Sequence, residues 1–109
     1  MRKNTRKWAK EKRVKSSIVH YPSKCFVCHE PYGVALVMAP WNYPFLLSIE
    51  PVIGAVAAGN CVVLKPSAYS PATSSIVRKV CEEAFEPQHV CVVEGGRAEN
   101  TALLEQRLD

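Results

Sequence analysis

Three short segments hold residues that could bind a ligand or stabilise a developing charge. They are Pro40-Trp41-Asn42, Lys65-Pro66-Ser67 and Glu94-Gly95-Gly96, and each follows a run of apolar residues. The first segment offers the neutral amide donor of Asn42, the second offers a cation, and the third offers a backbone without side chains that a ligand can approach closely. Such a combination suits a nucleotide or an oxyanion.

Each of these residues also has a purely structural interpretation. Asn42 stands just before a helix start and is of a type common in turns and caps. Lys65 at the end of a strand is typical of a solvated side chain, and Trp41 is typical of a core residue. Gly95-Gly96 is typical of a turn that requires positive φ. The functional interpretation therefore depends on whether the fold brings the three segments together.

Short apolar runs alternate with helical periods from Tyr32 onward, and this alternation predicts the fold. Apolar runs over 34–39, 61–64 and 90–93 predict strands that are covered on both faces. Apolar residues spaced by three and four predict helices over 45–57, 71–85 and 98–108. The order β-α-β-α-β-α predicts an α/β fold with a partial doubly wound, Rossmann-like parallel sheet.

Prolines, glycines and capping residues predict the helix boundaries. Ser70 followed by Pro71 predicts the N-cap and first residue of the second helix, and Gly59-Asn60 predicts the end of the first. Pro51 lies inside the first helix and predicts a kink or a break. In the third helix we expect three leucines to face inward: Leu103, Leu104 and Leu108.

The carboxyl ends of parallel strands meet at one edge of a sheet, where loops and helix N-termini supply free N–H groups. We therefore expect Asn42, Lys65 and Gly95-Gly96 to lie along one edge. The turn after the first strand reads Ala39-Pro40-Trp41-Asn42-Tyr43-Pro44 and lacks the pattern G-x-G-x-x-G. A standard pyrophosphate site after the first strand is therefore excluded.

Length and charge divide the chain in two. The 109 residues suffice for one domain or for a piece of a larger one. We expect a basic N-terminal arm over 1–30 and a partial dinucleotide-binding domain over 31–109. Residues 1–24 hold nine Lys or Arg against one acid, a net charge of +8, and residues 25–109 hold five against nine, a net charge of −4.

Within the arm we expect a short polar helix between Arg2 and Arg13 and an edge strand between Ser23 and His29. A basic arm can bind phosphate-rich partners, but Trp8 and Tyr21 are its only aromatic residues before position 25. We therefore interpret it as a solvated segment rather than as a nucleic-acid surface.

The five cysteines indicate the compartment and bear on metal binding. Their number is odd, and the charged start of the chain does not fit a secretory signal peptide, which predicts reduced thiols in the cytosol. A transit peptide is the alternative, because the arm is rich in Arg and poor in acids. Cys25-x-x-Cys28 with His29 gives three soft ligands where a zinc site needs four, so we expect no metal. The uncharged stretch 31–49 is interrupted by two prolines, so we expect no membrane segment.

Five consecutive residues, Pro40-Trp41-Asn42-Tyr43-Pro44, carry a resemblance to a known family. Together with Gly54 to Asn60 and Val62 to Ser67, which follow at the family's spacing, they resemble an aldehyde dehydrogenase, most closely the class 3 or fatty-aldehyde type. The resemblance covers the chain from about Lys7 to Asp109. Other matching segments are Glu30 to Gly33, Ser70 to Ser74, Val93 to Gly96 and Thr101 to Gln106.

The resemblance implies NAD(P)-dependent oxidation of an aldehyde to a carboxylate by cysteine attack, hydride transfer and hydrolysis. It implies that Asn42 is the oxyanion donor and that Pro40 and Trp41 flank the nicotinamide half of NAD or NADP. It implies cofactor contacts from Lys65, at the adenosine ribose, and from Ser67. It also implies that Gly95 and Gly96 lie near the adenine.

The sequence departs from the family pattern in two ways. Relatives commonly have a glutamate after Lys-Pro-Ser that accepts the ribose hydroxyls, whereas this chain has Ala68, which implies weaker cofactor binding or an altered preference between NAD and NADP. The family's phosphate-side glycine turn, general base and nucleophilic cysteine come later than the segments found here. We therefore expect no turnover by these residues alone. The alternative is a non-catalytic module that associates with other subunits through the exposed edge of its third strand.

Overall fold

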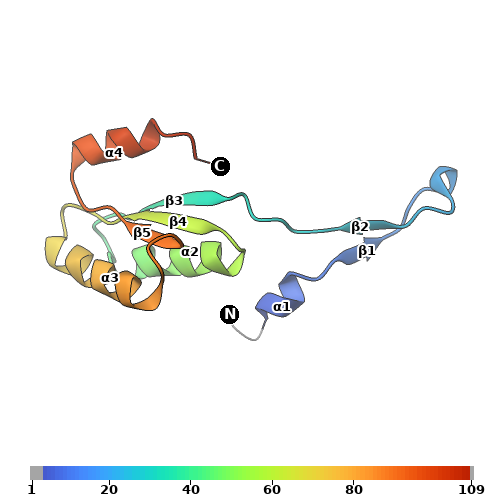
Figure 1. Ribbon diagram of the computed structural model, residues 1–109, viewed down its shortest axis with the longest axis horizontal. Coiled ribbons are helices and arrows are strands. Elements are labelled where there is room, and N and C mark those ends of the chain that lie inside the picture. The colour runs from blue at the N-terminus through green and yellow to red at the C-terminus, as the bar shows by residue number, and fades with distance from the viewer. Residues whose placement is uncertain (1–3, 109) are drawn as a thin grey trace. The chain divides into compact units, whose positions relative to one another are not determined.

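The computed structural model describes residues 4–108, which form two compact units that meet between Pro31 and Tyr32 in the sequence (Figure 1). The first unit begins with helix α1 (Thr5–Trp8), within the range where the sequence predicts a helix; Arg2 and Lys3 lie outside the described residues. Strands β1 (Lys12–Val14) and β2 (Cys25–Val27) then pair antiparallel, with the short 3-10 helix η1 (Ile18–His20) between them.

The second unit contains a three-stranded parallel sheet with three helices. Its elements are β3 (Val34–Met38), α2 (Leu46–Ala57), β4 (Cys61–Lys65), α3 (Pro71–Ala84), β5 (Val90–Val92) and α4 (Arg97–Leu104). The strand order is β3-β4-β5, and both strand pairs are parallel. Figure 1 shows α2 and α3 on one side of this sheet and α4 on the other. The predicted α/β fold with alternating strands and helices is confirmed.

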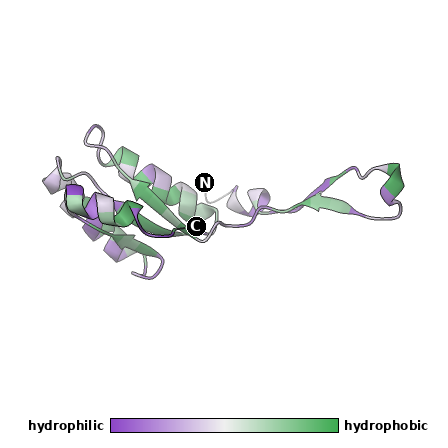
Figure 2. Ribbon diagram, turned by 90° about the horizontal axis from the view of Figure 1, so that it is seen from above, coloured by the Kyte–Doolittle hydropathy of each residue, from purple (hydrophilic) through white to green (hydrophobic). Residues whose placement is uncertain are grey.

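The core lies between the sheet and the helices α2 and α3. The central strand contributes Val62 and Leu64, which are 2% and 0% exposed. The register places Val62 beside Val90 and Leu64 beside Val92, so these side chains share one face. The helices contribute three further core residues: Val52, Val77 and Cys81. In Figure 2 the strands of this unit are mostly green, the colour of apolar residues.

Burial alternates in β5 and over the first four residues of β4, which differs from the predicted burial on both faces. Val63 in β4 is half-buried and Cys91 in β5 is exposed, whereas their sequence neighbours are buried. Helices α2 and α3 cover one face, and among the described residues only the short helix α4 lies on the other. This unequal covering of the two faces explains the alternation in burial, because successive strand residues point to opposite faces of the sheet.

Three details of the helices correct the sequence-based predictions. Helix α2 is continuous through Pro51, so the predicted break is absent. Ser70 occupies the N-cap of α3, but its hydroxyl makes no cap hydrogen bond. Helix α4 ends at Leu104 rather than at position 108, and Leu104 is 67% exposed rather than inward-facing, because no described element covers that side of the helix.

Buried Asn60 joins the end of α2 to the start of β3. Its Oδ1 accepts a hydrogen bond from the Gly33 N–H at 3.1 Å, and its Nδ2 donates to the Ala55 carbonyl at 3.2 Å. Asn60 is only 6% exposed, so water does not easily take over its hydrogen bonds. Asn60 therefore links the last turn of α2 to the residue that precedes β3.

We expect Asn60→Ala to lower the free energy of unfolding by about 1 to 3 kcal/mol, because it leaves the amide of Gly33 without its partner. Urea denaturation followed by circular dichroism measures the change. Gln88→Ala, at an exposed position between α3 and β5, is the control and should leave the stability unchanged. Equal stabilities of the Asn60 variant and the original chain would show that the hydrogen bonds of Asn60 do not stabilise the fold.

Candidate functional site

The carboxyl ends of the three parallel strands lie along one edge of the sheet. Met38, the last residue of β3, is in register with Lys65, the last residue of β4, and Leu64 is in register with Val92 of β5. The ladder continues one residue further on each side: the Ala39 N–H donates to the Lys65 carbonyl, and the Val93 N–H donates to the Leu64 carbonyl. The loops that follow β3, β4 and β5 therefore all leave from this edge.

Lys65 joins two of these loops. Its residue is 3% exposed, and its Nζ donates to the Gly95 carbonyl at 2.6 Å and to the Pro66 carbonyl at 2.8 Å. The interpretation of Lys65 as a solvated side chain is therefore wrong. An ammonium group has three N–H donors, and within residues 4–108 these two carbonyls are the acceptors that it reaches. One donor is left for a ligand.

A cavity of about 360 Å³ opens beside Lys65, within the size range of small-molecule sites. Its lining includes Lys65, Ser67 and Ala68 from the end of β4 and the loop that follows, and Gly96, Arg97 and Asn100 from the start of α4. Two of the lining residues are cationic, and none is Asp or Glu. The structure therefore brings Lys65, Ser67 and Gly96 together at one concave, electropositive place.

Two side chains on the cavity wall have hydrogen-bonding capacity to spare. The Ser67 hydroxyl accepts from the Tyr69 N–H at 3.2 Å, which leaves its own O–H free to donate. The Oδ1 atom of Asn100 is shielded from solvent and accepts no hydrogen bond from the part of the chain that the structure describes. Buried acceptors of this kind normally have a partner, but a shielded Oδ1 is out of reach of a ligand unless the side chain moves.

The glycine turn after β5 is shaped by Glu99. The Glu99 carboxylate accepts a hydrogen bond from the Gly96 N–H at 2.6 Å and so caps the first turn of α4. Gly95 has a φ of +147°, and a Cβ atom at this position would collide with the Glu99 side chain. The turn interpretation of Gly95-Gly96 is correct, and the same turn presents the Gly95 carbonyl to Lys65.

Hydrogen bonds lower the pKa of Glu99 below its ordinary value of 4.5; the N–H of Glu99 itself contributes most, then the N–H of Gly96. A carboxylate with a lowered pKa stabilises the fold at neutral pH, and this contribution is lost as the pH falls through the pKa of the folded state. We therefore expect Glu99→Gln to lower the melting temperature at about pH 7 and to have little effect at about pH 3. Glu83→Gln, on the exposed side of α3, is the control. An effect of Glu99→Gln that is independent of pH would contradict this account.

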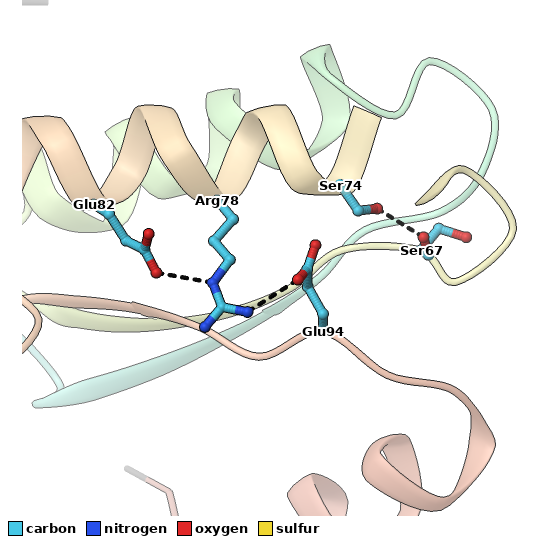
Figure 3. Close-up of polar contacts among 5 residues, drawn as sticks. All are labelled: Ser67, Ser74, Arg78, Glu82 and Glu94. Atoms are coloured by element: carbon cyan, nitrogen blue, oxygen red, sulfur yellow. Dashed lines mark hydrogen bonds and ion pairs between the residues drawn. The ribbon is translucent and has the colours of Figure 1, made fainter. Parts of the chain in front are cut away.

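Helix α3 holds both loops that border the cavity (Figure 3). The Ser74 hydroxyl donates to the Ser67 carbonyl at 2.8 Å. The Arg78 guanidinium pairs with Glu82 at 2.8 Å and with Glu94, the residue before the glycine turn, at 3.0 Å. These contacts raise the pKa of Arg78, chiefly through the hydrogen bond to Glu82. Ser74 and Arg78 thus fix the loop after β4 and the turn after β5 to the same helix.

Sequence reasoning missed Ser74, Arg78 and Asn100. Ser74 could have been found, because it falls on the helix face that also carries Val77 and Cys81 and is a polar residue among apolar ones. The pairing of Arg78 with Glu94 joins residues 16 positions apart, and no local pattern indicates it. Asn100 lies one turn into α4, and only the position of that helix brings it to the cavity.

Pro40, Trp41 and Asn42 lie in the loop between β3 and α2 and are exposed. They leave from the same edge of the sheet as the other two segments, but they do not line the 360 Å³ cavity, whose wall on that side is Met38 and Ala39. Trp41 is 67% exposed, so its interpretation as a core residue is wrong. The edge therefore has two parts, the cavity beside Lys65 and the exposed loop that carries Asn42.

Within the second unit, none of the three cysteines lies at this edge. Cys61 begins β4 at the opposite end of the strand, Cys91 is in the middle of β5, and Cys81 is buried in α3. Burial raises the pKa of the Cys81 thiol, which makes it a poor nucleophile. Among residues 4–108, the His, Cys, Asp and Glu side chains form no group of three that could hold a metal ion. Nor does this part of the chain contain a helix that could cross a membrane.

Comparison with known proteins decides the family. The family described as "Aldehyde dehydrogenase family" matches residues 3–108. The chain belongs to the aldehyde dehydrogenase family. The resemblance read from Pro40-Trp41-Asn42-Tyr43-Pro44 and the later segments is thus confirmed.

Relatives of this aldehyde dehydrogenase family chain include class 3 proteins. Aldehyde dehydrogenase family 3 member H1 of Arabidopsis thaliana is 49% identical over 98% of the chain, which spans 22% of that relative. The substrate-bound structure of Staphylococcus aureus AldH is 39% identical, with a TM-score of 0.93 over 96% of the chain and 23% of its own length. The Mycobacterium tuberculosis aldehyde dehydrogenase complexed with NAD+ is 29% identical, with a TM-score of 0.74 over 88% of the chain and 19% of its own length. The chain therefore spans about a fifth of the length of these relatives.

Proposed function

We propose that this part of the chain binds the adenosine half of a nicotinamide cofactor, NAD or NADP. The observation that carries the proposal is the buried ammonium of Lys65, which bridges the loops after β4 and β5 and faces a cavity without carboxylates. The position fits the rule that ligands bind beyond the carboxyl ends of parallel strands. The Mycobacterium tuberculosis relative, whose fold matches, is described as complexed with NAD+.

The residues around the cavity fit an adenosine ribose. The third N–H of Lys65 and the hydroxyl of Ser67 can donate to the ribose oxygens. The turn at Gly95-Gly96 has no side chain to obstruct the adenine. Lys65, Ser67, Gly95 and Gly96 come from the ends of two neighbouring strands and the loops that follow them, and this explains why the two pairs lie far apart in sequence.

The exposed loop after β3 has a separate role in the proposal. Pro40 and Trp41 flank the nicotinamide half, and the Asn42 amide donates to the oxygen of an aldehyde substrate as negative charge develops on it. When bound, the nicotinamide accepts the hydride that the aldehyde carbon loses. For the whole protein we propose the oxidation of aldehydes, including fatty aldehydes, to carboxylates.

We further propose that residues 1–109 do not oxidise aldehydes by themselves. Covalent catalysis on an aldehyde needs an activated thiolate close to the reacting carbon. Cys61, Cys81 and Cys91, the cysteines of the second unit, lie inside strands or in the buried face of α3 and not at the edge that carries Asn42. For the compartment, we propose that these free thiols work in reducing surroundings, and the cytosol is our prediction.

Two measurements on the purified chain test the proposal. Isothermal titration calorimetry with 5′-AMP should show binding, because 5′-AMP is the adenosine half of the cofactor with its 5′-phosphate. A mixture of the chain, NAD+ or NADP+ and a medium-chain aldehyde should produce no reduced cofactor. Absence of nucleotide binding would contradict the cofactor site. Turnover would contradict the proposal that residues 1–109 do not oxidise aldehydes by themselves.

A second candidate function is association with other subunits through the sheet edges. Among the described residues, β5 pairs only with β4, and its Cys91 is exposed. Helix α2 and its N-cap residue also expose three large apolar side chains: Phe45, Leu46 and Ile53. Open strand edges and apolar surface favour association. Size-exclusion chromatography with light scattering tests it: oligomers are expected, and a sharp monomer peak would contradict it.

A further inference from the structure

We propose that the 360 Å³ cavity prefers NADP to NAD, and that Arg97 binds the 2′-phosphate by which the two cofactors differ. The inference rests on the proposed function, because it takes the cavity as the adenosine ribose site. It adds a selectivity and a residue to that function. A role for Arg97 does not follow from membership of the family.

Arg97 presents an unused cation to the cavity. It is the first residue of α4, lines the cavity beside Gly96 and is exposed. Within the described part of the chain its guanidinium forms no ion pair or side-chain hydrogen bond, in contrast to Arg78, which binds two carboxylates. A guanidinium with free donors is suited to a phosphate, which it can bind through two parallel hydrogen bonds.

The carboxylates near the cavity are already engaged elsewhere. Glu99 is held by the Gly96 N–H, and Glu94 is paired with Arg78 and lines a neighbouring cavity of about 310 Å³. Neither carboxylate lines the 360 Å³ cavity, and Glu99 lies close enough to interact with the charge of Lys65, whereas Arg97 has no such partner among the described residues. A ribose 2′-hydroxyl, as in NAD, is usually recognised by an Asp or Glu that accepts its hydrogen bond, whereas an Arg nearby accommodates a 2′-phosphate.

Ala68 gives the cavity wall no side-chain acceptor for a ribose hydroxyl. It lines the cavity directly after Ser67. A methyl group neither accepts a hydrogen bond nor repels a phosphate. The wall thus lacks the anion that favours a free ribose and holds two cations, Lys65 and Arg97, that favour a phosphorylated one.

The experiment compares two nucleotides that differ only in the 2′-phosphate, 5′-AMP and adenosine 2′,5′-bisphosphate, by isothermal titration calorimetry on the full chain. We expect the bisphosphate to bind at least about tenfold more tightly, because charge-assisted hydrogen bonds to phosphate are the strong ones. Arg97→Gln should reduce the affinity for the bisphosphate by about tenfold and the affinity for 5′-AMP by a smaller factor. Ala68→Glu should shift the preference toward 5′-AMP.

Two control variants separate specific recognition from general attraction between the basic chain and an anion. Arg107→Gln removes a cation after α4, and Lys15→Gln removes one from the basic arm; neither residue lines the cavity. Both should leave the ratio of the two affinities unchanged. Circular dichroism establishes that every variant is folded.

The outcomes distinguish the inference from the proposed function. Equal affinities for the two nucleotides, or equal losses in Arg97→Gln and Arg107→Gln, would overturn the preference for NADP and leave the adenosine site standing. Absence of binding by either nucleotide would overturn the adenosine site itself. A preference for the bisphosphate that Arg97→Gln removes, with both controls unaffected, supports the inference.

Discussion

A Lys65→Met variant is expected to lose affinity for adenosine nucleotides by about tenfold to a hundredfold. Methionine keeps most of the apolar volume of the lysine stem but has no N–H donor. The variant therefore loses the donor that faces the cavity and also releases the carbonyls of Gly95 and Pro66. Because the Gly95 carbonyl belongs to the turn after β5, the cavity loses both a contact and part of its shape. Titration calorimetry with 5′-AMP measures the effect.

Lys79→Met is the matched control for Lys65→Met. Lys79 is exposed on α3, so this variant changes the net charge by the same amount without touching the cavity. Similar affinities for the original chain and Lys79→Met are expected. If the two variants weaken binding equally, the affinity comes from net charge alone, and the bridge between the loops has no part in binding.

The second large effect concerns the core. We expect Leu64→Ala to lower the free energy of unfolding by about 2 to 5 kcal/mol, since it leaves a cavity in the middle of the sheet. Leu64 is 0% exposed and lies in register between Val37 and Val92, so three strands depend on it. Small domains are stabilised by only about 5 to 15 kcal/mol, and the variant should therefore be partly unfolded at moderate temperature.

Leu104→Ala removes the same atoms from a position that is 67% exposed. Its stability should stay within about 0.5 kcal/mol of the original chain. Thermal and urea denaturation of the two leucine variants measures the contrast. Comparable losses from both would show that α4 packs more firmly than its exposed leucine indicates, and that β4 is not the centre of the core.

The order and direction of the strands could be predicted from the sequence because they depend on local patterns. Apolar runs bounded by Pro40, Gly59 and Pro66 identify the strands, and helical periods between them require parallel pairing. The predicted strand limits differ from the observed ones by one residue, as at Lys65, which belongs to β4. The meeting of the loops at one edge follows from the pairing alone.

The environment of individual side chains could not be predicted in the same way. A lysine at the end of a strand is typical of a solvated side chain. The burial of Lys65 depends on the Gly95 carbonyl, which is 30 residues away in sequence. Leu104 and Ile53 fit apolar helix faces, yet both are exposed because the described elements do not cover them. Such contacts depend on how distant elements pack, which periodicity does not describe.

The most direct test of the adenosine site is nuclear magnetic resonance of the ¹⁵N-labelled chain during titration with 5′-AMP. The amide signals of Lys65, Ser67, Gly96 and Arg97 should shift together and saturate with one dissociation constant, because these residues border one cavity. The signals of β1 and β2 in the basic arm should stay in place. Shifts confined to the arm, or shifts at Ser67 without shifts at Gly96, would show that the loops after β4 and β5 do not form a common nucleotide site.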